Sequence, residues 1–151
     1  MTTEPGPLTI IVGVDGSDSS IEALRQALWL AKALNASVTA LTCWNYPSAY
    51  AAPYALGGFD FKGTAQKILD TAVADAFGPD RPGNLTTRLV QGPARPTLIE
   101  ASRHASLLVL GRRGMGGFKG LLLGSVSAAC TAHAHCPVVV VHAPKVDEHH
   151  A

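Results

Sequence analysis

The strongest constraint on the fold is a succession of short apolar runs separated by segments with helical periodicity. Most of these runs are continuously apolar, with no alternation between polar and apolar positions, which is typical of strands buried on both faces. They cover residues 8–14, 37–44, 84–90, 107–110 and 136–141. The third run is the most polar. Strands alternating with helices in this way predict an α/β protein, with an open five-stranded parallel sheet and helices on both faces.

The clearest helical pattern follows the first run. Apolar residues recur from Ile21 to Leu34 with a period of 3.6, Ser17 or Asp18 can cap the start, and Asn35 can end the helix. Three further helices are predicted at residues 66–77, 96–102 and 124–133, and residues 44–63 are predicted to form a surface loop.

The composition places these elements in one core. The chain has 151 residues, of which 47% are hydrophobic and 15% charged, against roughly 25% charged residues in typical soluble domains. We expect a single domain over residues 1–143 and a polar tail over 144–151. A net charge of +1 provides no broad cationic field for nucleic acid or acidic lipid.

The expected compartment is the cytoplasm. The N-terminus lacks the basic and apolar regions of a signal peptide, and no apolar run approaches the roughly 20 residues of a membrane span. The three cysteines are an odd and sparse set, which favours free thiols in a reducing compartment.

The candidate site is the glycine-rich segment 111–127, which lies between a predicted strand and a predicted helix. Glycines allow close backbone approach, helix N-termini attract anions, and hydroxyls can donate to phosphate oxygens. The segment has neither the Walker A spacing nor G-x-G-x-x-G, so glycine content alone is equally compatible with a mobile turn. The residues that favour phosphate binding are Gly111, Arg112, Arg113, Gly114, Lys119, Gly124, Ser125 and Ser127.

The spacing G-x2-G-x9-G-S, from Gly111 through Gly114 to Gly124 and Ser125, resembles the nucleotide-binding signature of the universal stress protein family. The sequences VGVDGS at 12–17 and HAHCPVVVV at 133–141 also resemble this family, and together the likeness covers residues 8–142. It implies the ATP-binding subgroup and a Rossmann-like sheet of strand order 3-2-1-4-5, similar to the adenine nucleotide alpha hydrolase fold. That order reverses between strands 1 and 4, where a ligand crevice is expected.

The resemblance also implies roles for individual residues. Asp15 would reach the ribose or a Mg²⁺ ion, although an Asp-Gly turn that caps the next helix is the alternative. The residues implied to pack on the adenine are Gly13, Val14, and Ala40 or Leu41. Those implied to take the ribose and phosphates are Gly111, Arg113, Gly114, Gly124, Ser125, Val126 and Ser127, and Arg112 adds charge. Two positions depart from the family's pattern: Arg112 stands where serine is frequent, and Ser106 stands where aspartate is usual.

The function implied is that of a stress-response protein regulated by ATP, AMP or a cyclic nucleotide. Beyond Asp15 the sequence offers no evident acid to orient a nucleophile, so catalysis is secondary. Two alternatives remain: a slow ATP hydrolase or adenylyl-transfer enzyme that uses Asp15 and Mg²⁺, and a chaperone-like dimer without nucleotide. The resemblance and an apolar edge strand predict a homodimer through Val138, Val139, Val140 and Val141.

Overall fold

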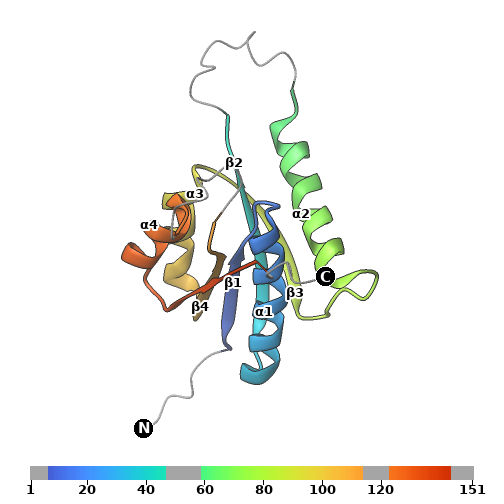
Figure 1. Cartoon of the computed structure of the whole chain (residues 1–151), viewed down its shortest axis with the longest axis vertical. Coiled ribbons are helices and arrows are strands. Elements are labelled where there is room, and N and C mark those ends of the chain that lie inside the picture. The colour runs from blue at the N-terminus through green and yellow to red at the C-terminus, as the bar shows by residue number, and fades with distance from the viewer. Residues whose placement is uncertain (1–6, 47–58, 114–122, 144–151) are drawn as a thin grey trace, which may run out of the picture.

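The computed structural model describes residues 7–46, 59–113 and 123–143, and these residues form one five-stranded sheet (Figure 1). The strand order is β3-β2-β1-β4-β5, and every pair of neighbours is parallel. The predicted fold class and strand order are therefore confirmed. The strands are β1 (Thr9–Gly13), β2 (Ser37–Trp44), β3 (Leu85–Gln91), β4 (Leu107–Gly111) and β5 (Val138–Val141).

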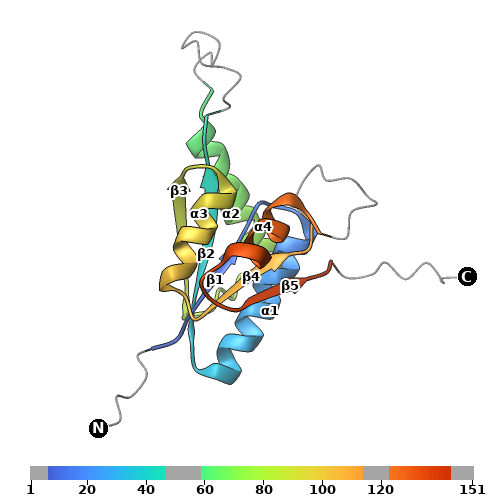
Figure 2. The same cartoon turned by 90° about the vertical axis from the view of Figure 1, so that its left-hand side faces the viewer.

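Helices cover both faces of the sheet, as Figures 1 and 2 show together. Helices α1 and α2 pack on one face, and α3 and α4 pack on the other. Each face has its own apolar core cluster. The helices are α1 (Asp18–Leu34), α2 (Phe61–Phe77), α3 (Ala94–Ala101), which continues into the 3₁₀ turn η3 (Ser102–His104), and α4 (Ser125–His133).

Helix α1 forms as its sequence predicts. The Ser17 side chain caps it by accepting a hydrogen bond from the backbone N–H of Ser20 at 3.2 Å. Its small and apolar positions, such as Leu24 and Ala27, are fully buried against the sheet. Asn35 ends the helix in the left-handed conformation, with φ of 52°.

Two helices begin earlier than predicted. Helix α2 starts at Phe61 rather than residue 66, because Asp60 caps it through a hydrogen bond from the Gly63 N–H at 2.8 Å. The start of α2 therefore lies inside the predicted loop, of which residues 47–58 are outside the described part of the chain. Helix α3 starts at Ala94, so Pro96 lies within its first turn, where an N–H has no helical acceptor.

Side chains of β2 alternate between the two cores. Val38 and Ala40 belong to the cluster under α1 and α2, whereas Leu41 belongs to the cluster under α3 and α4. Neighbouring positions of one strand therefore face opposite layers. Within the described ranges, no helix combines the length and apolar character needed to cross a membrane.

Candidate functional site

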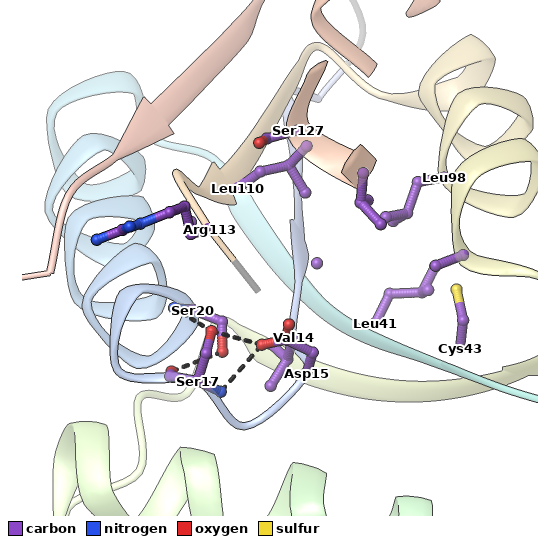
Figure 3. A pocket seen from close by; sticks show the side chains of 14 residues that line it. Val14, Asp15, Ser17, Ser20, Leu41, Cys43, Leu98, Leu110, Arg113 and Ser127 are labelled. Carbon is purple, nitrogen blue, oxygen red and sulfur yellow. Dashed lines mark hydrogen bonds between the residues drawn. The ribbon is translucent and has the colours of Figure 1, made fainter. Parts of the chain in front are cut away.

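A cavity lies where the strand order reverses, beyond the carboxyl ends of β1 and β4 (Figure 3). This is the position at which open α/β sheets bind their ligands. Its walls come from the ends of β1, β2 and β4 and from the N-terminal parts of α1, α3 and α4. The lining residues are Gly13, Val14, Asp15, Ser17, Ser20, Leu41, Cys43, Ala94, Leu98, Leu110, Gly111, Arg113, Val126 and Ser127.

The turn between β1 and α1 forms one polar wall. Gly16 has φ of 87°, a conformation that favours glycine, and it turns the chain after Asp15. The Asp15 Oδ1 atom then accepts hydrogen bonds from the Ser17 N–H at 2.9 Å and from the Ser17 hydroxyl at 2.6 Å. Asp15 therefore supports the turn that leads into α1, and its exposed carboxylate remains at the cavity wall.

The opposite polar wall is organised around the backbone of Arg112. Its N–H donates to the Val141 carbonyl at 2.7 Å, and its carbonyl accepts from the Gly124 N–H at 2.7 Å. The Ser127 hydroxyl also donates to that carbonyl at 2.7 Å. These bonds fix the start of α4 to the ends of β4 and β5. Because the Ser127 hydroxyl proton already has acceptors within the protein, Ser127 is less available as a phosphate donor than the sequence alone indicates.

The two helix N-termini at these polar walls differ in capping. Helix α1 is capped by Ser17, but α4 begins after Gly124, which has no side chain to cap it. The first N–H groups of a helix have no acceptor within the helix, and the helix dipole makes them attractive to an anion. Val126 and Ser127, in this first turn, line the cavity. Of the two helix N-termini, that of α4 is therefore the more favourable for an anion.

Gly111 owes its residue type to a close approach between β4 and α1. A Cβ atom placed on Gly111 would lie 2.3 Å from the Ser19 Oγ and 2.8 Å from the Ser19 backbone carbon. The space that the sequence assigns to a ligand is therefore filled by the first turn of α1. The Ser19 hydroxyl donates to the Arg113 carbonyl, which holds the end of β4 against this helix.

The inner end of the cavity is apolar, and its walls are Leu41, Leu98, Leu110 and the Cys43 thiol. Leu41, Leu98 and Leu110 are buried, and Cys43 is half-buried. Burial, with a smaller contribution from Cys130, raises the pKa of Cys43 from 9.0 to about 11. Cys43 is therefore a neutral thiol at physiological pH, compatible with an apolar ring beside it.

The enclosed part of the cavity measures about 90 Å³. Pockets that hold drug-sized ligands usually measure roughly 300–1,000 Å³. A ligand as large as a nucleotide would therefore place only one portion in the enclosed space and would extend beyond it.

The structure brings together most of the residues that the sequence singles out. The predicted residues that line the cavity are Gly13, Val14, Asp15, Leu41, Gly111, Arg113, Val126 and Ser127. Arg112, Gly124 and Ser125 are outside the lining but build the start of α4. Gly114 lies outside the described residues. Ala40 needs correction, because it is fully buried on the opposite face of the sheet and belongs to the core under α1 and α2.

Several lining residues have no assigned role in the sequence analysis: Ser17, considered only as a helix cap, and Ser20, Cys43, Ala94, Leu98 and Leu110. Position could have identified some of them, since Leu110 precedes Gly111 and Cys43 lies two residues beyond Leu41. No local sequence pattern marks Ala94 or Leu98 as cavity residues. They reach the cavity because α3 packs across the carboxyl end of β2.

The family model described as the Universal stress protein family matches residues 8–142. Among curated proteins, Universal stress protein Rv2624c of Mycobacterium tuberculosis is 32% identical over 150 residues, covering 96% of this chain and 52% of the relative. The chain thus spans about half the length of the curated relatives it matches.

Solved structures give a consistent match. The universal stress protein UspA from Lactobacillus plantarum has a TM-score of 0.67 and 26% identity, over 91% of this chain and 99% of that one. A universal stress protein in complex with cAMP has a TM-score of 0.58 and 30% identity, over 91% and 98% of the two chains. A family protein from Arabidopsis thaliana with AMP bound has a TM-score of 0.57, 17% identity and coverages of 91% and 93%, a likeness of fold.

Proposed function

The chain belongs to the universal stress protein family, and from that premise we propose that it holds an adenine nucleotide in the cavity between β1 and β4. The family member with bound cAMP, at 30% identity, supports an adenine nucleotide as the ligand. ATP is the first candidate, because the spacing of Gly111, Gly124 and Ser125 resembles that of the ATP-binding members.

The observation that carries this proposal is the division of the cavity into an apolar and a polar end. Leu41, Leu98 and Leu110 provide an apolar slot of the kind that an adenine ring requires. Ser17 and Arg113 lie toward the polar side (Figure 3). A ligand with a flat apolar ring joined to a polar, anionic part matches this order.

The phosphates of the proposed ligand would lie at the start of α4. The uncapped N–H groups of that helix favour an anion there, and Arg113, which also lines the cavity, adds positive charge to its polar side. Since the enclosed space is small, the ring would fill it and the phosphates would extend past Val126.

The proposed role is regulatory, with nucleotide occupancy favouring one conformation or one partner surface. Asp15 is the one carboxylate among the described residues that line the cavity. Phosphoryl transfer requires a positioned nucleophile together with a metal clamp, and one carboxylate does not supply both. Mg²⁺ is held in nucleotide sites by one or two carboxylates and the phosphates, so Asp15 fits as a single protein ligand to a nucleotide-bound ion.

A second candidate function is slow ATP hydrolysis. It is favoured by one observation, the placement of the Asp15 carboxylate at the cavity wall opposite the start of α4. Turnover of labelled ATP that disappears in Asp15→Asn would support it. Recovery of intact ATP from the purified protein would count against it.

We also propose a homodimer through the free edge of β5. This strand pairs only with β4 among the described strands, which leaves one row of backbone groups unpaired. Val138, Val139 and Val140 are half-buried, so the edge is apolar as well as unpaired. Pairing with a second copy would cover an edge that is otherwise prone to aggregation.

The experiment that tests nucleotide binding begins with extraction and identification of any nucleotide that copurifies with the protein. Calorimetric titration with ATP, AMP and cAMP then measures affinity in the wild type and in Val126→Trp, which fills the start of the cavity. Ala128→Trp is the matched control, because Ala128 is exposed on the same helix and does not line the cavity. If Val126→Trp binds nucleotide as tightly as the wild type does, this cavity is not the binding site. If the wild type binds none of the three nucleotides, the proposal is rejected.

A further inference from the structure

A second cavity of about 600 Å³ lies on the same face of the sheet, between the strands and the outer side of α3. Its floor is formed by Ile11 of β1, Leu41 of β2 and Val90 of β3, which come from adjacent strands. Its side wall is formed by residues of α3 and η3, including Ala101. We call this space the β3 groove. Its volume is within the range of ligand pockets, and its floor is apolar.

The β3 groove is separate from the cavity described above, although the two share Leu41. Helix α3 lies between them: Leu98 faces the first cavity, whereas Thr97 and Ala101 face the β3 groove. No residue of β4 or α4 lines the β3 groove among the residues that the structure describes. A ligand here would therefore not contact the start of α4.

The charges around the β3 groove favour an anion. Arg88 of β3 lines the groove and is exposed, and its side chain makes no hydrogen bond or ion pair with any other described residue. Glu100 is the only carboxylate among the described lining residues, and its Oε2 atom is paired with the Arg103 Nε at 3.0 Å. His104 adds an imidazole side chain to the lining of the groove. The uncompensated charge in the groove is thus the Arg88 guanidinium.

We propose that the β3 groove binds a small organic carboxylate with an apolar body. The apolar body would lie on Ile11, Leu41 and Val90, and the carboxylate would pair with the Arg88 guanidinium. A guanidinium can hold a carboxylate through two parallel hydrogen bonds, which gives orientation as well as affinity. The hydroxyls of Thr39 and Thr97, which also line the groove, can complete the polar contacts.

The test uses sodium octanoate as the charged probe and octanol as its uncharged counterpart, with amide chemical shifts of the full chain as the readout. We expect octanoate to cause saturable shifts at Thr39, Val90 and Thr97, with smaller changes at Gly13 and Gly111. Arg88→Gln should weaken octanoate binding by about tenfold or more, because it removes a charge-assisted interaction, and should leave octanol binding unchanged.

Arg95→Gln is the matched control, since Arg95 is an exposed cation on α3 that does not line the β3 groove. It should bind octanoate like the wild type. The proposal is overturned if octanoate gives no saturable shift, if the shifts are confined to Gly13 and Gly111, or if Arg88→Gln and Arg95→Gln behave alike. None of these results depends on nucleotide binding, so the two proposals fail separately.

Discussion

The carboxylate of Asp15 accepts two hydrogen bonds from Ser17, one from its N–H at 2.9 Å and one from its hydroxyl at 2.6 Å. The same hydroxyl oxygen caps the Ser20 N–H at the start of α1. Asp15, two residues beyond the end of β1, therefore orients the residue that caps α1. This link gives Asp15 a structural role in addition to any contact with a nucleotide or Mg²⁺.

The two roles of Asp15 can be separated by substitution. Asp15→Ala should lower the free energy of unfolding by about 1 kcal/mol, because the Ser17 groups lose their acceptor. Asp15→Asn should retain most of that stability, since its amide oxygen can still accept, but should weaken binding of ATP with Mg²⁺ more than binding without it. Urea unfolding and calorimetric titration measure the two effects. If the wild type and Asp15→Asn have equal ATP affinity at all Mg²⁺ concentrations, Asp15 supports the turn but does not contribute to binding of the nucleotide or of Mg²⁺.

The Ser127 hydroxyl should contribute to stability through its bond to the Arg112 carbonyl. Ser127→Ala should lower the free energy of unfolding by about 1 kcal/mol, because it removes a buried hydrogen bond. Ser125→Ala, at an exposed position two residues earlier in α4, should change it by less than about 0.5 kcal/mol. Urea unfolding of both variants checks this difference, and equal effects would contradict the role of Ser127.

Gly111 should tolerate no larger residue. Gly111→Ala places a Cβ 2.8 Å from the Ser19 backbone carbon, which cannot move without displacing α1, so we expect a loss of about 1–3 kcal/mol. Gly83→Ala is the control, because no atom lies within 4 Å of the added Cβ. Thermal and urea unfolding compare the two. Equal stability of Gly111→Ala and Gly83→Ala would mean that β4 and α1 are less closely packed than the structure indicates.

Cys43 should react slowly with thiol reagents at neutral pH. Its pKa is raised from 9.0 to about 11, so the reactive thiolate becomes abundant only as the pH approaches 11. The free energy of unfolding should fall over the same pH range. Above pH 9 the Cys43 thiol ionises in the unfolded chain but keeps its proton in the folded one, so the stability present below pH 9 is lost between about pH 9 and 11. Alkylation followed by peptide mass analysis measures the rate against pH. Fast modification of native Cys43 at pH 7.5 would be the contrary result.

The proposed dimer should depend on Val140. This residue is half-buried on β5 and belongs to neither core cluster, so Val140→Lys should separate the subunits with little effect on folding. Light scattering should give about twice 15.7 kDa for the wild type and about 15.7 kDa for the variant. A wild-type mass of one chain would contradict the dimer. Circular dichroism checks that Val140→Lys still folds.

The sequence alone predicted the order of helices and strands, a cap for the first helix at Ser17 or Asp18, and the end of that helix at Asn35. These features follow from local rules, because hydrophobic periodicity and capping depend on residues that are close in the chain. The strand order came from the resemblance of short motifs to a family, and the sheet confirmed it. The Asp60 cap extends α2 to Phe61, ahead of the apolar pattern, whereas α3 begins at Ala94 without a side-chain cap, two residues before the predicted start at Pro96.

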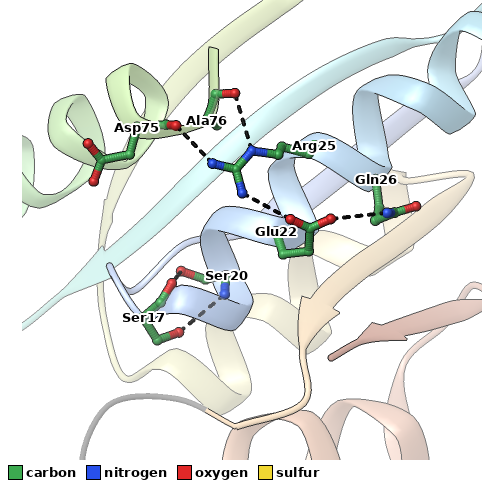
Figure 4. A network of polar contacts seen from close by, with 7 residues as sticks. All are labelled: Ser17, Ser20, Glu22, Arg25, Gln26, Asp75 and Ala76. Carbon is green, nitrogen blue, oxygen red and sulfur yellow. Dashed lines mark hydrogen bonds and ion pairs between the residues drawn. The ribbon is translucent and has the colours of Figure 1, made fainter. Parts of the chain in front are cut away.

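Only the tertiary structure decided which of two neighbours in β2 faces the cavity. Ala40 and Leu41 are both apolar, and the choice depends on which helices cover each face of the sheet. The contribution of Leu98, the close contact of Gly111 with Ser19, and the position of Arg88 beside α3 likewise arise from elements far apart in the chain. The polar network across α1 and α2 in Figure 4, in which Arg25 donates to the Asp75 carbonyl at 2.9 Å, has the same origin. Such contacts have no local sequence pattern, because packing between layers, rather than spacing along the chain, brings their partners together.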